Sequence, residues 1–194
     1  MKESVLNKNN NFIEGYYLSD LSLCDKLVDL FENHKEKFPG QTGSGIDKTK
    51  KDSLDIRLNI INVAKHKVLE LYIKELLNCL TLYKEKYKFC DEGIRPWGLE
   101  YDWNIQKYKP GQGYHSFHCE RASLSSSKRH LVWMTYLNDV KKGGETEWYY
   151  QKLKVKPEKG LTIIWSADWT FTHKGHTTID EDKYIITGWY EFKE

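Results

Sequence analysis

The sequence predicts a mainly β protein of the α+β class, in which N-terminal helices support a β-sandwich or jelly roll. Two observations predict this fold. Apolar residues repeat with a helical period in the first half of the chain and with a period of two from residue 99 onward. Aromatic residues make up 14% of the chain, with seven Trp and thirteen Tyr, a composition that favours strands over a pure helix bundle.

The length of 194 residues suits one domain, which can bury a core without disulfides or metal ions as staples. We expect a single domain over residues 1–194, with a polar tail at 1–11, a helical support at 12–97 and a jelly-roll core at 98–194 that carries the catalytic residues. A metal ion in such a chain is therefore expected to have a functional rather than a structural role.

Charge and composition exclude several classes of protein. The formal net charge is +2, from 30 Lys and Arg against 28 Asp and Glu, so nucleic acid and anionic membranes are not expected partners. The N-terminal segment has no apolar signal region and no 18-residue apolar stretch occurs, which predicts a soluble, cytoplasmic protein. The four cysteines form no C-x-x-C pair and are expected to be reduced thiols.

Two helices are expected before residue 98. The first covers residues 19–38, with Ser19 or Asp20 as the N-cap, a stop at Pro39–Gly40, and an apolar stripe of Leu23, Leu27, Leu30 and Phe31. The second runs from about His66 to Phe89, with an apolar face of Leu69, Tyr72, Ile73, Leu76, Leu80, Tyr83 and Tyr87.

The segment 40–53 between these helices is rich in Gly, Thr, Ser and Lys and has no hydrophobic period. It is expected to be a mobile loop with solvated lysines. Two roles remain open for it: a flap over the mouth of a binding site, or a plain linker.

Strands are expected from residue 98 onward. In the stretch 98–108 an apolar face of Leu99, Tyr101, Trp103 and Ile105 alternates with polar residues. Turn signals at 139–144 and 158–160 separate further strands, which we place at 129–138, 145–151, 152–157, 161–165 and 183–192.

A candidate metal site lies in the stretch "GYHSFHCE", residues 113–120. In an extended chain, positions i and i+2 point to one side, so His118 and Glu120 can face one ion while His115 and Cys119 point elsewhere. A third ligand is available in "WTFTHKGHTT", residues 169–178, as His173 or His176. Two imidazoles and one carboxylate are typical of non-haem Fe(II) oxygenases.

Each of these residues also has an ordinary interpretation. His115, His118 and Cys119 could belong to a zinc site, but no second Cys or His pair at suitable spacing completes a tetrahedral set. Tyr108 and Tyr136 alone would be strand aromatics, and Lys183 alone an exposed lysine at a strand edge. Only the combination is informative.

In combination, the stretch 99–192 resembles the prolyl 4-hydroxylase-like branch of the Fe(II)- and 2-oxoglutarate-dependent oxygenases. The residues that carry the resemblance follow the family's order: Tyr108, His118 with Glu120, Arg129, "YLND" at Tyr136–Asp139, "GGET" at Gly143–Thr146, His173 and Lys183. The family's spacing of about ten residues to the lysine favours His173 over His176. Glu120 departs from the family's more common Asp.

The resemblance implies a double-stranded β-helix and an enzyme that hydroxylates an unactivated C–H bond, in this branch of a prolyl residue in a peptide or protein. It implies Fe(II) held by His118, Glu120 and His173, which are also the catalytic residues. It further implies 2-oxoglutarate and O₂ as co-substrates and ascorbate as reductant. Lys183 would meet the far carboxylate of 2-oxoglutarate, with Tyr108 and Tyr136 donating hydrogen bonds and Arg129 as an alternative anchor.

Two alternative functions remain open at this point: an oxygenase acting on a small molecule or nucleobase, and a non-catalytic jelly-roll binding module. A binding module has no reason to keep Lys183 together with a three-ligand set. Trp165 and Trp169 precede the distal histidine and could either wall the site or fill the sandwich core.

Overall fold

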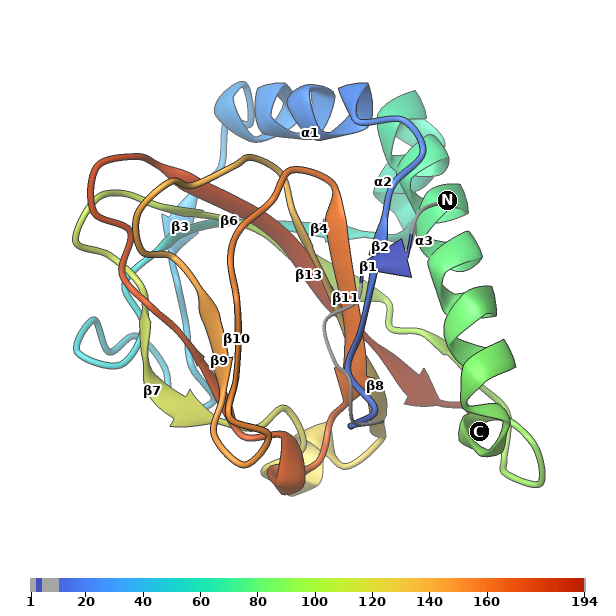
Figure 1. The fold of residues 1–194 in the computed structure, drawn as a ribbon. Helices are drawn as coiled ribbons and strands as arrows, with labels where there is room; N and C mark the ends of the chain where they lie inside the picture. The colour runs from blue at the N-terminus through green and yellow to red at the C-terminus, as the bar shows by residue number, and fades with distance from the viewer. Residues whose placement is uncertain (1–2, 5–10, 194) are drawn as a thin grey trace.

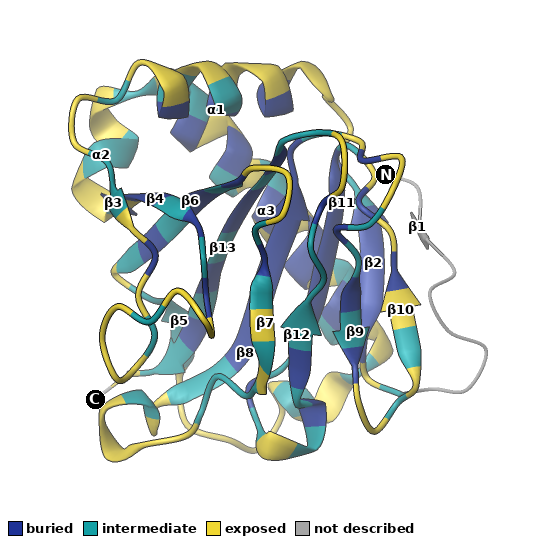
Figure 2. Ribbon diagram, turned by 90° about the vertical axis from the view of Figure 1, so that its left-hand side faces the viewer, coloured by how far each residue is buried: buried dark blue, intermediate teal, exposed yellow. Residues whose placement is uncertain are grey.

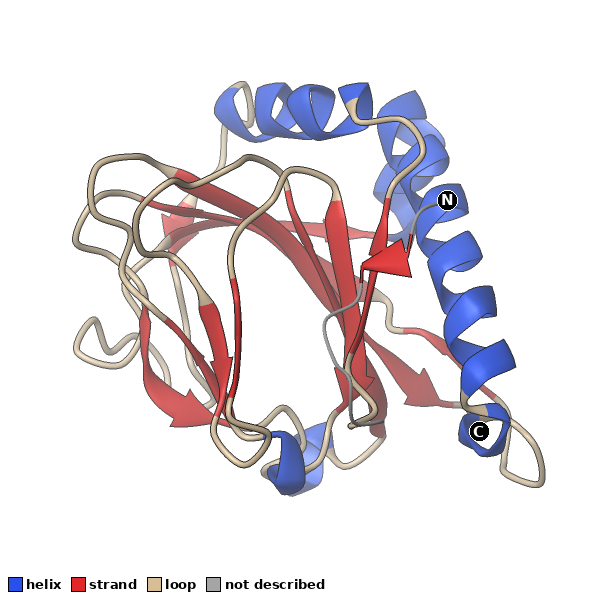
Figure 3. Ribbon diagram, in the orientation of Figure 1, coloured by secondary structure: helices blue, strands red, loops and turns tan. Residues whose placement is uncertain are grey.

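The computed structural model describes residues 3–4 and 11–193, and consists of two antiparallel β-sheets with helices on one side (Figures 1 and 3). The larger sheet has the order β1 (Glu3–Ser4), β2 (Glu14–Tyr17), β11 (Leu161–Ser166), β8 (Arg129–Tyr136), β13 (Lys183–Phe192), β6 (Asp102–Tyr108), β4 (Leu54–Asn59) and β3 (Phe38–Pro39), with β5 (Trp97–Leu99) also paired to β13. The smaller sheet has the order β10 (Leu153–Val155), β9 (Thr146–Trp148), β12 (His173–Gly175) and β7 (Tyr114–His118). A mainly β fold with few helices is therefore confirmed.

The helices cover the outer face of the larger sheet. They are α1 (Ser22–Glu32), α2 (Ile60–Lys65) and α3 (Lys67–Lys86), and Figure 1 shows α1 crossing one end of the sheets while α3 runs along the side. Leu27 and Phe31 of α1 and Leu76 of α3 are fully buried and belong to one cluster with Trp133 and Ile186 of the sheet. This apolar contact holds the helices against the sheet.

A second core fills the space between the two sheets. Its members include Tyr108, Tyr136, Trp148, Trp165 and Ile185. Strand β13 serves both cores because alternate residues face opposite sides: Ile185 points between the sheets, whereas Ile186 and Tyr190 face the helices. Lys183 has the same parity as Ile185, so the strand also turns this lysine into the interior.

The first helix is shorter than the expected 19–38. It begins at Ser22, and Leu21 occupies the N-cap position rather than Ser19 or Asp20, although the Asp20 carboxylate accepts a hydrogen bond from the Ser22 N–H at 2.9 Å. It ends at Glu32, where the Lys37 ammonium donates to the Glu32 carbonyl at 3.0 Å. The stop at Pro39–Gly40 was therefore placed too late. The long helix, at 67–86, lies within the expected 66–89.

The region 12–97 is more than a helical support. It also contributes β2, β3 and β4, three strands of the larger sheet that the sequence analysis did not predict. Strand β4 pairs with β6 along six residues, and its Ile56 and Leu58 are buried. Its apolar residues Leu54, Ile56 and Leu58 alternate with polar ones, so the period of two was present in the sequence although the strand was not predicted, and its Asp55 is buried as well.

Two expected strands are interrupted. The stretch 98–108 forms β5 and β6 with a break at residues 100–101, and Tyr101 is 49% exposed rather than part of the buried face. The expected strand at 145–151 ends at Trp148, because Tyr149 and Tyr150 form an exposed turn.

The segment 40–53 is tied to its neighbours at several points. The His115 N–H donates to the Lys50 carbonyl at 2.7 Å, and the Asp52 N–H donates to the Gly113 carbonyl at 2.9 Å. The expectation of solvated lysines is wrong for Lys51, which is 4% exposed and pairs with Asp55 at 2.7 Å. A flap function for the exposed part of this segment stays a prediction.

The remaining expectations concern the termini and the cysteines. Most of the expected polar tail at 1–11 lies outside the described residues, apart from Glu3–Ser4, which pair with β2. All four cysteines are free, and Cys24 and Cys79 are buried. Among the helices of the described residues, none is both long enough and apolar enough to cross a membrane.

Candidate metal centre

The smaller sheet brings two histidines together. Strands β7 and β12 are antiparallel neighbours, and His118 lies directly opposite His173 in their register. The two imidazole rings are 4.4 Å apart between centroids. Residues directly opposite each other in such a pair have their side chains on one face of the sheet, here the inner face.

Glu120 completes a three-residue cluster. Its Oε1 lies 3.3 Å from Nε2 of His118 and 3.4 Å from Nε2 of His173, and the three potential ligand atoms all lie within 4.8 Å of one another. The side chains of His118, Glu120 and His173 are 19%, 14% and 7% exposed, so the cluster is largely buried but keeps some contact with solvent. Within residues 3–4 and 11–193, this is the one group of three or more such side chains that could hold a metal ion.

The hydrogen bonds of the two imidazoles suit metal binding. Nδ1 of His118 lies 3.1 Å from the Ser116 carbonyl and Nδ1 of His173 lies 2.9 Å from the Phe171 carbonyl. Carbonyl oxygens only accept, so each Nδ1 donates its proton, and Nε2 is the ring nitrogen that faces Glu120 and is available to ligate a metal ion.

The protonation states also fit a divalent cation. Burial and the neighbouring His173 lower the pKa of His118, which favours the neutral imidazole. Burial alone would raise the pKa of Glu120, but the two imidazoles outweigh it and hold that pKa well below its usual range. A neutral imidazole and an ionised carboxylate are the forms that ligate metal ions, and this donor set suits Fe(II).

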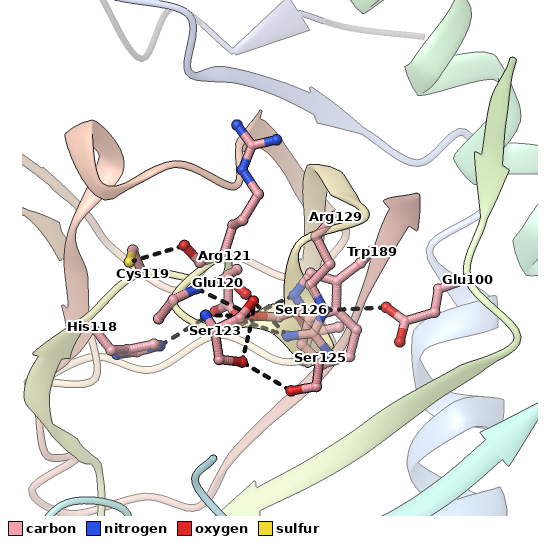
Figure 4. Close-up of polar contacts among 12 residues, drawn as sticks. Glu100, His118, Cys119, Glu120, Arg121, Ser123, Ser125, Ser126, Arg129 and Trp189 are labelled. Carbon is pink, nitrogen blue, oxygen red and sulfur yellow. Dashed lines mark hydrogen bonds and ion pairs between the residues drawn. The ribbon is translucent and has the colours of Figure 1, made fainter. Parts of the chain in front are cut away.

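A bracing network holds the outer oxygen of Glu120 (Figure 4). The Trp189 indole N–H donates to Oε2 at 2.9 Å, and a guanidinium nitrogen of Arg129 lies 3.6 Å from the same oxygen. The guanidinium of Arg129 stacks 3.6 Å above the Trp189 ring and is itself 3.3 Å from the Glu100 carboxylate. These contacts leave Oε1 facing the histidines and restrain the glutamate's extra methylene group.

The sequence patterns did not identify Trp189 or Glu100. Trp189 lies six residues after Lys183 on the same strand, an even separation that places both side chains on one face. This spacing could have identified Trp189 as a residue of the site. No local signal identified Glu100.

Lys183 is a buried cation with no ion-pair partner among the described residues. It is 2% exposed, its ammonium donates to the Gly144 carbonyl at 3.1 Å, and it lies 4.7 Å above the Tyr108 ring. Burial lowers its pKa from 10.5 to about 8, against a weaker attraction from Glu145. In the part of the chain that the structure describes, no carboxylate lies within ion-pair distance, so the site is suited to an anionic ligand.

The ammonium of Lys183 and the His118–Glu120–His173 cluster share one inner surface. On β12 the inward positions are His173 and Gly175, which are separated by about 6 to 7 Å along the strand. A Cβ atom at Gly175 would lie 3.6 Å from the Lys183 ammonium and 3.6 Å from Cβ of Tyr114, whose ring stacks on His118 at 3.7 Å. The distance of about 6 to 7 Å between the positions of His173 and Gly175 is comparable with the length of a five-carbon dicarboxylate.

The two tyrosines from the sequence analysis lie in the same interior. The Tyr108 hydroxyl donates to Gln106 Oε1 at 2.7 Å and the Tyr136 hydroxyl donates to Thr146 Oγ1 at 2.7 Å. Burial raises the pKa of both, so each stays a hydrogen-bond donor.

Arg129 lies in a different part of the site. It pairs with Glu191 in the register of β13, eight positions from Lys183, which corresponds to about 25 Å along the strand. Its contacts are with Glu100, Glu120 and Trp189, so the structure associates it with the metal-site carboxylate rather than with Lys183.

The other candidate ligands lie elsewhere. His115 is exposed, and Nε2 of His176 lies 2.5 Å from Glu147 Oε2. Of the two candidate wall residues, Trp165 contacts the His173 ring at 5.1 Å between centroids, whereas Trp169 is 63% exposed.

Residues 103–191 match the family model described as the 2OG-Fe(II) oxygenase superfamily. This match and the His118–Glu120–His173 cluster support a 2-oxoglutarate-dependent dioxygenase. This class of dioxygenase uses Fe(II), 2-oxoglutarate and O₂, and the histidine and carboxylate donors of the cluster suit that metal. No curated protein matches this oxygenase significantly in sequence.

Solved structures similar to this oxygenase include several prolyl hydroxylases. The viral collagen prolyl hydroxylase of Paramecium bursaria Chlorella virus 1, solved with 2-oxoglutarate, has 21% identity and a TM-score of 0.70, over 95% of this chain and 98% of that one. The Pseudomonas putida prolyl 4-hydroxylase has 15% identity and a TM-score of 0.71, over 95% of both chains. The Trichoplax adhaerens prolyl hydroxylase, solved with a peptide fragment of the hypoxia-inducible factor, has 17% identity and a TM-score of 0.74, over 95% of this chain and 85% of that one. Likeness at these identities establishes a shared fold.

Proposed function

We propose that this oxygenase hydroxylates a prolyl residue within a peptide or protein segment. We also infer that its two sheets form a double-stranded β-helix, with residues 98–194 as the catalytic core of a single domain. The strands β2 and β4 from the region 12–97 would extend the larger sheet of that core.

In this proposal, His118, Glu120 and His173 hold Fe(II). Bound Fe(II), with 2-oxoglutarate and O₂, supplies the oxidising chemistry that inserts one oxygen atom into a C–H bond while 2-oxoglutarate becomes succinate and CO₂. The chain's own contribution is to orient and to protect. The two Nδ1–H bonds to carbonyls fix the imidazoles, and Trp189 and Arg129 hold Glu120 so that Oε1 points to the metal position.

Lys183 is the observation that carries the proposal. An unpaired ammonium in a protein interior is unfavourable, and the lysine has no carboxylate partner within ion-pair distance among the described residues. The far carboxylate of 2-oxoglutarate would supply the missing charge, and the Tyr108 ring below the ammonium would bury the pair away from water. A protein that only used this fold for binding would gain nothing from such a lysine.

The prolyl substrate is supported by less direct observations. The three similar solved structures described above are prolyl hydroxylases, one of them with a peptide bound. The near-neutral charge of the chain suits an uncharged peptide better than a polyanion. The sequence order from Tyr108 to Lys183 follows the pattern of the prolyl 4-hydroxylase branch.

The test is mass spectrometry of proline-containing peptides after incubation with the enzyme, Fe(II), 2-oxoglutarate and ascorbate. We expect a gain of one oxygen atom on proline, matched by succinate release. His118→Ala should abolish both, whereas the matched control His176→Ala should retain them, because His176 contacts Glu147 outside the cluster. Succinate release that is stimulated by free amino acids or nucleosides, and by no prolyl peptide, would contradict the prolyl assignment.

A further inference from the structure

Four exposed aromatic rings form a continuous row on the surface near the metal site. They are Phe117, Tyr149, Tyr150 and Trp169, hereafter the aromatic strip, and they are 38%, 58%, 57% and 63% exposed. Successive ring centroids lie 5.2, 5.2 and 5.9 Å apart, with interplanar angles of 81°, 86° and 85°. The rings pack edge to face, and their exposed fractions leave part of each ring open to solvent.

The strip lies at the same end of the smaller sheet as the metal ligands. Phe117 immediately precedes His118 on β7 and points to the opposite face, and Trp169 lies four residues before His173. Tyr149 and Tyr150 form the turn between β9 and β10, and β9 is the neighbour of β12. Figure 2 shows this outer face, with β7, β12, β9 and β10 side by side.

The strip is held in a defined conformation. The Tyr149 N–H donates to the Thr172 carbonyl at 2.9 Å, and the Gln151 side-chain amide donates to the Thr170 carbonyl at 2.9 Å. These bonds fasten the β9–β10 turn to the segment that carries Trp169. At the other end, the Lys174 ammonium lies 4.5 Å above the Phe117 ring. A surface ordered before binding loses less conformational entropy when a ligand arrives.

The polar groups of the strip favour one type of ligand. The hydroxyls of Tyr149 and Tyr150 and the indole N–H of Trp169 have no hydrogen-bond partner among the described residues, so three donors accompany the open rings. A polyproline II segment has the complementary chemistry: its carbonyls accept hydrogen bonds, its proline residues have no N–H, and its rings pack on aromatic faces. Two residues of such a segment advance about 6 Å, close to the ring spacing.

We propose that the aromatic strip binds a proline-rich segment of the substrate chain, outside the residue that is hydroxylated. This inference rests on the proposed prolyl substrate and extends it, because it makes the enzyme select substrates by a flanking proline-rich sequence. A second copy of this chain is a less suitable occupant, since it would place the same donors opposite one another.

The experiment compares two proline peptides with one hydroxylation site each. One is too short to reach the strip, and the other has about 15 residues, which span about 45 Å at about 3.1 Å per residue. The variant is the double substitution Tyr150→Ser with Trp169→Ser. Its matched control is Phe89→Ser, which removes a ring that is 75% exposed beside α3.

For the double variant we expect the KM of the long peptide to rise about tenfold, since two stacking contacts are lost, while kcat and the KM of the short peptide stay unchanged. Titration of the long peptide into metal-free protein, followed by tryptophan fluorescence or NMR, should show the same loss of affinity without any turnover. Phe89→Ser should behave as the wild type in both assays.

The outcomes separate this inference from the proposed function. If the double variant leaves the affinity of the long peptide unchanged while prolines are hydroxylated, the strip has no role and the function stands. If the long peptide binds at the strip but no proline is hydroxylated, the proposed substrate is wrong. If sedimentation shows a dimer that the double variant dissociates, the strip is a self-association surface and the inference is overturned.

Discussion

Replacement of Lys183 by methionine should stabilise the ligand-free protein and weaken its binding of 2-oxoglutarate. Burial lowers the pKa of Lys183 from 10.5 to about 8. Because the folded pKa lies below the unfolded one, the unfolded chain binds more protons between these two values. The buried lysine therefore lowers the free energy of unfolding of the wild-type protein. This destabilisation is fully present below pH 8 and disappears as the pH rises toward 10.5.

The magnitude follows from these two pKa values. A difference from 10.5 to about 8 corresponds to about 3 kcal/mol at pH 7. Methionine retains the aliphatic volume but loses the hydrogen bond to the Gly144 carbonyl, which contributes about 1 kcal/mol. Lys183→Met should therefore raise the free energy of unfolding by about 2 kcal/mol at pH 7, because removal of the unpaired charge outweighs the lost hydrogen bond.

The same substitution should weaken 2-oxoglutarate binding by about 2–5 kcal/mol, because the ligand's far carboxylate would be left unpaired. In the wild type, the affinity should fall about tenfold per pH unit above pH 8, since only the protonated lysine binds the carboxylate. Urea unfolding of the ligand-free proteins and calorimetric titration of 2-oxoglutarate with Mn(II) in place of Fe(II) measure the two effects.

The matched control is Lys141→Met, at a lysine side chain that is 87% exposed, which should change neither quantity. Lys183→Arg should keep part of the affinity because it keeps the charge. A Lys183→Met protein that is less stable than the wild type and binds 2-oxoglutarate with unchanged affinity would refute the reasoning.

Two further predictions concern the carboxylate brace and the buried ion pair. Trp189→Phe removes the hydrogen-bond donor to Glu120 Oε2 but keeps an aromatic ring beneath Arg129. Calorimetry should therefore show that the affinity for Mn(II) falls about 10- to 100-fold. An unchanged affinity would mean that this hydrogen bond does not position Glu120 as a metal ligand. Lys51→Ala leaves the Asp55 carboxylate buried and unpaired, so urea unfolding should show that the free energy of unfolding falls by about 3–5 kcal/mol. Adding a second substitution, Asp55→Ala, should restore most of this stability. A single variant as stable as the wild type would contradict this account.

Local patterns in the sequence were sufficient to predict the type of fold and the ligand-bearing stretches. Alternation of apolar residues predicted the strand β6, because that period follows from the geometry of the strand alone, and turn signals separated the stretches that form β8, β11 and β13. The separation of two residues between His118 and Glu120 predicted that both face one point. These are properties of a few neighbouring residues.

The choice between His173 and His176 came from the family's spacing to Lys183. The structure supports this choice geometrically, since it places His173 opposite His118 and His176 beside Glu147.

The tertiary structure alone decided which distant residues meet. The burial of Lys51 against Asp55 is one example, because no local pattern indicated that this lysine would be buried. The brace on Glu120 joins residues from β8, β13 and the β5–β6 break, and the aromatic strip joins β7, the β9–β10 turn and the turn before β12. Such contacts depend on strand register and sheet order, which arise only when segments far apart in the chain pack together. The sequence by itself therefore determined the chemistry available to this protein, and the packing of the two sheets decided where that chemistry is concentrated.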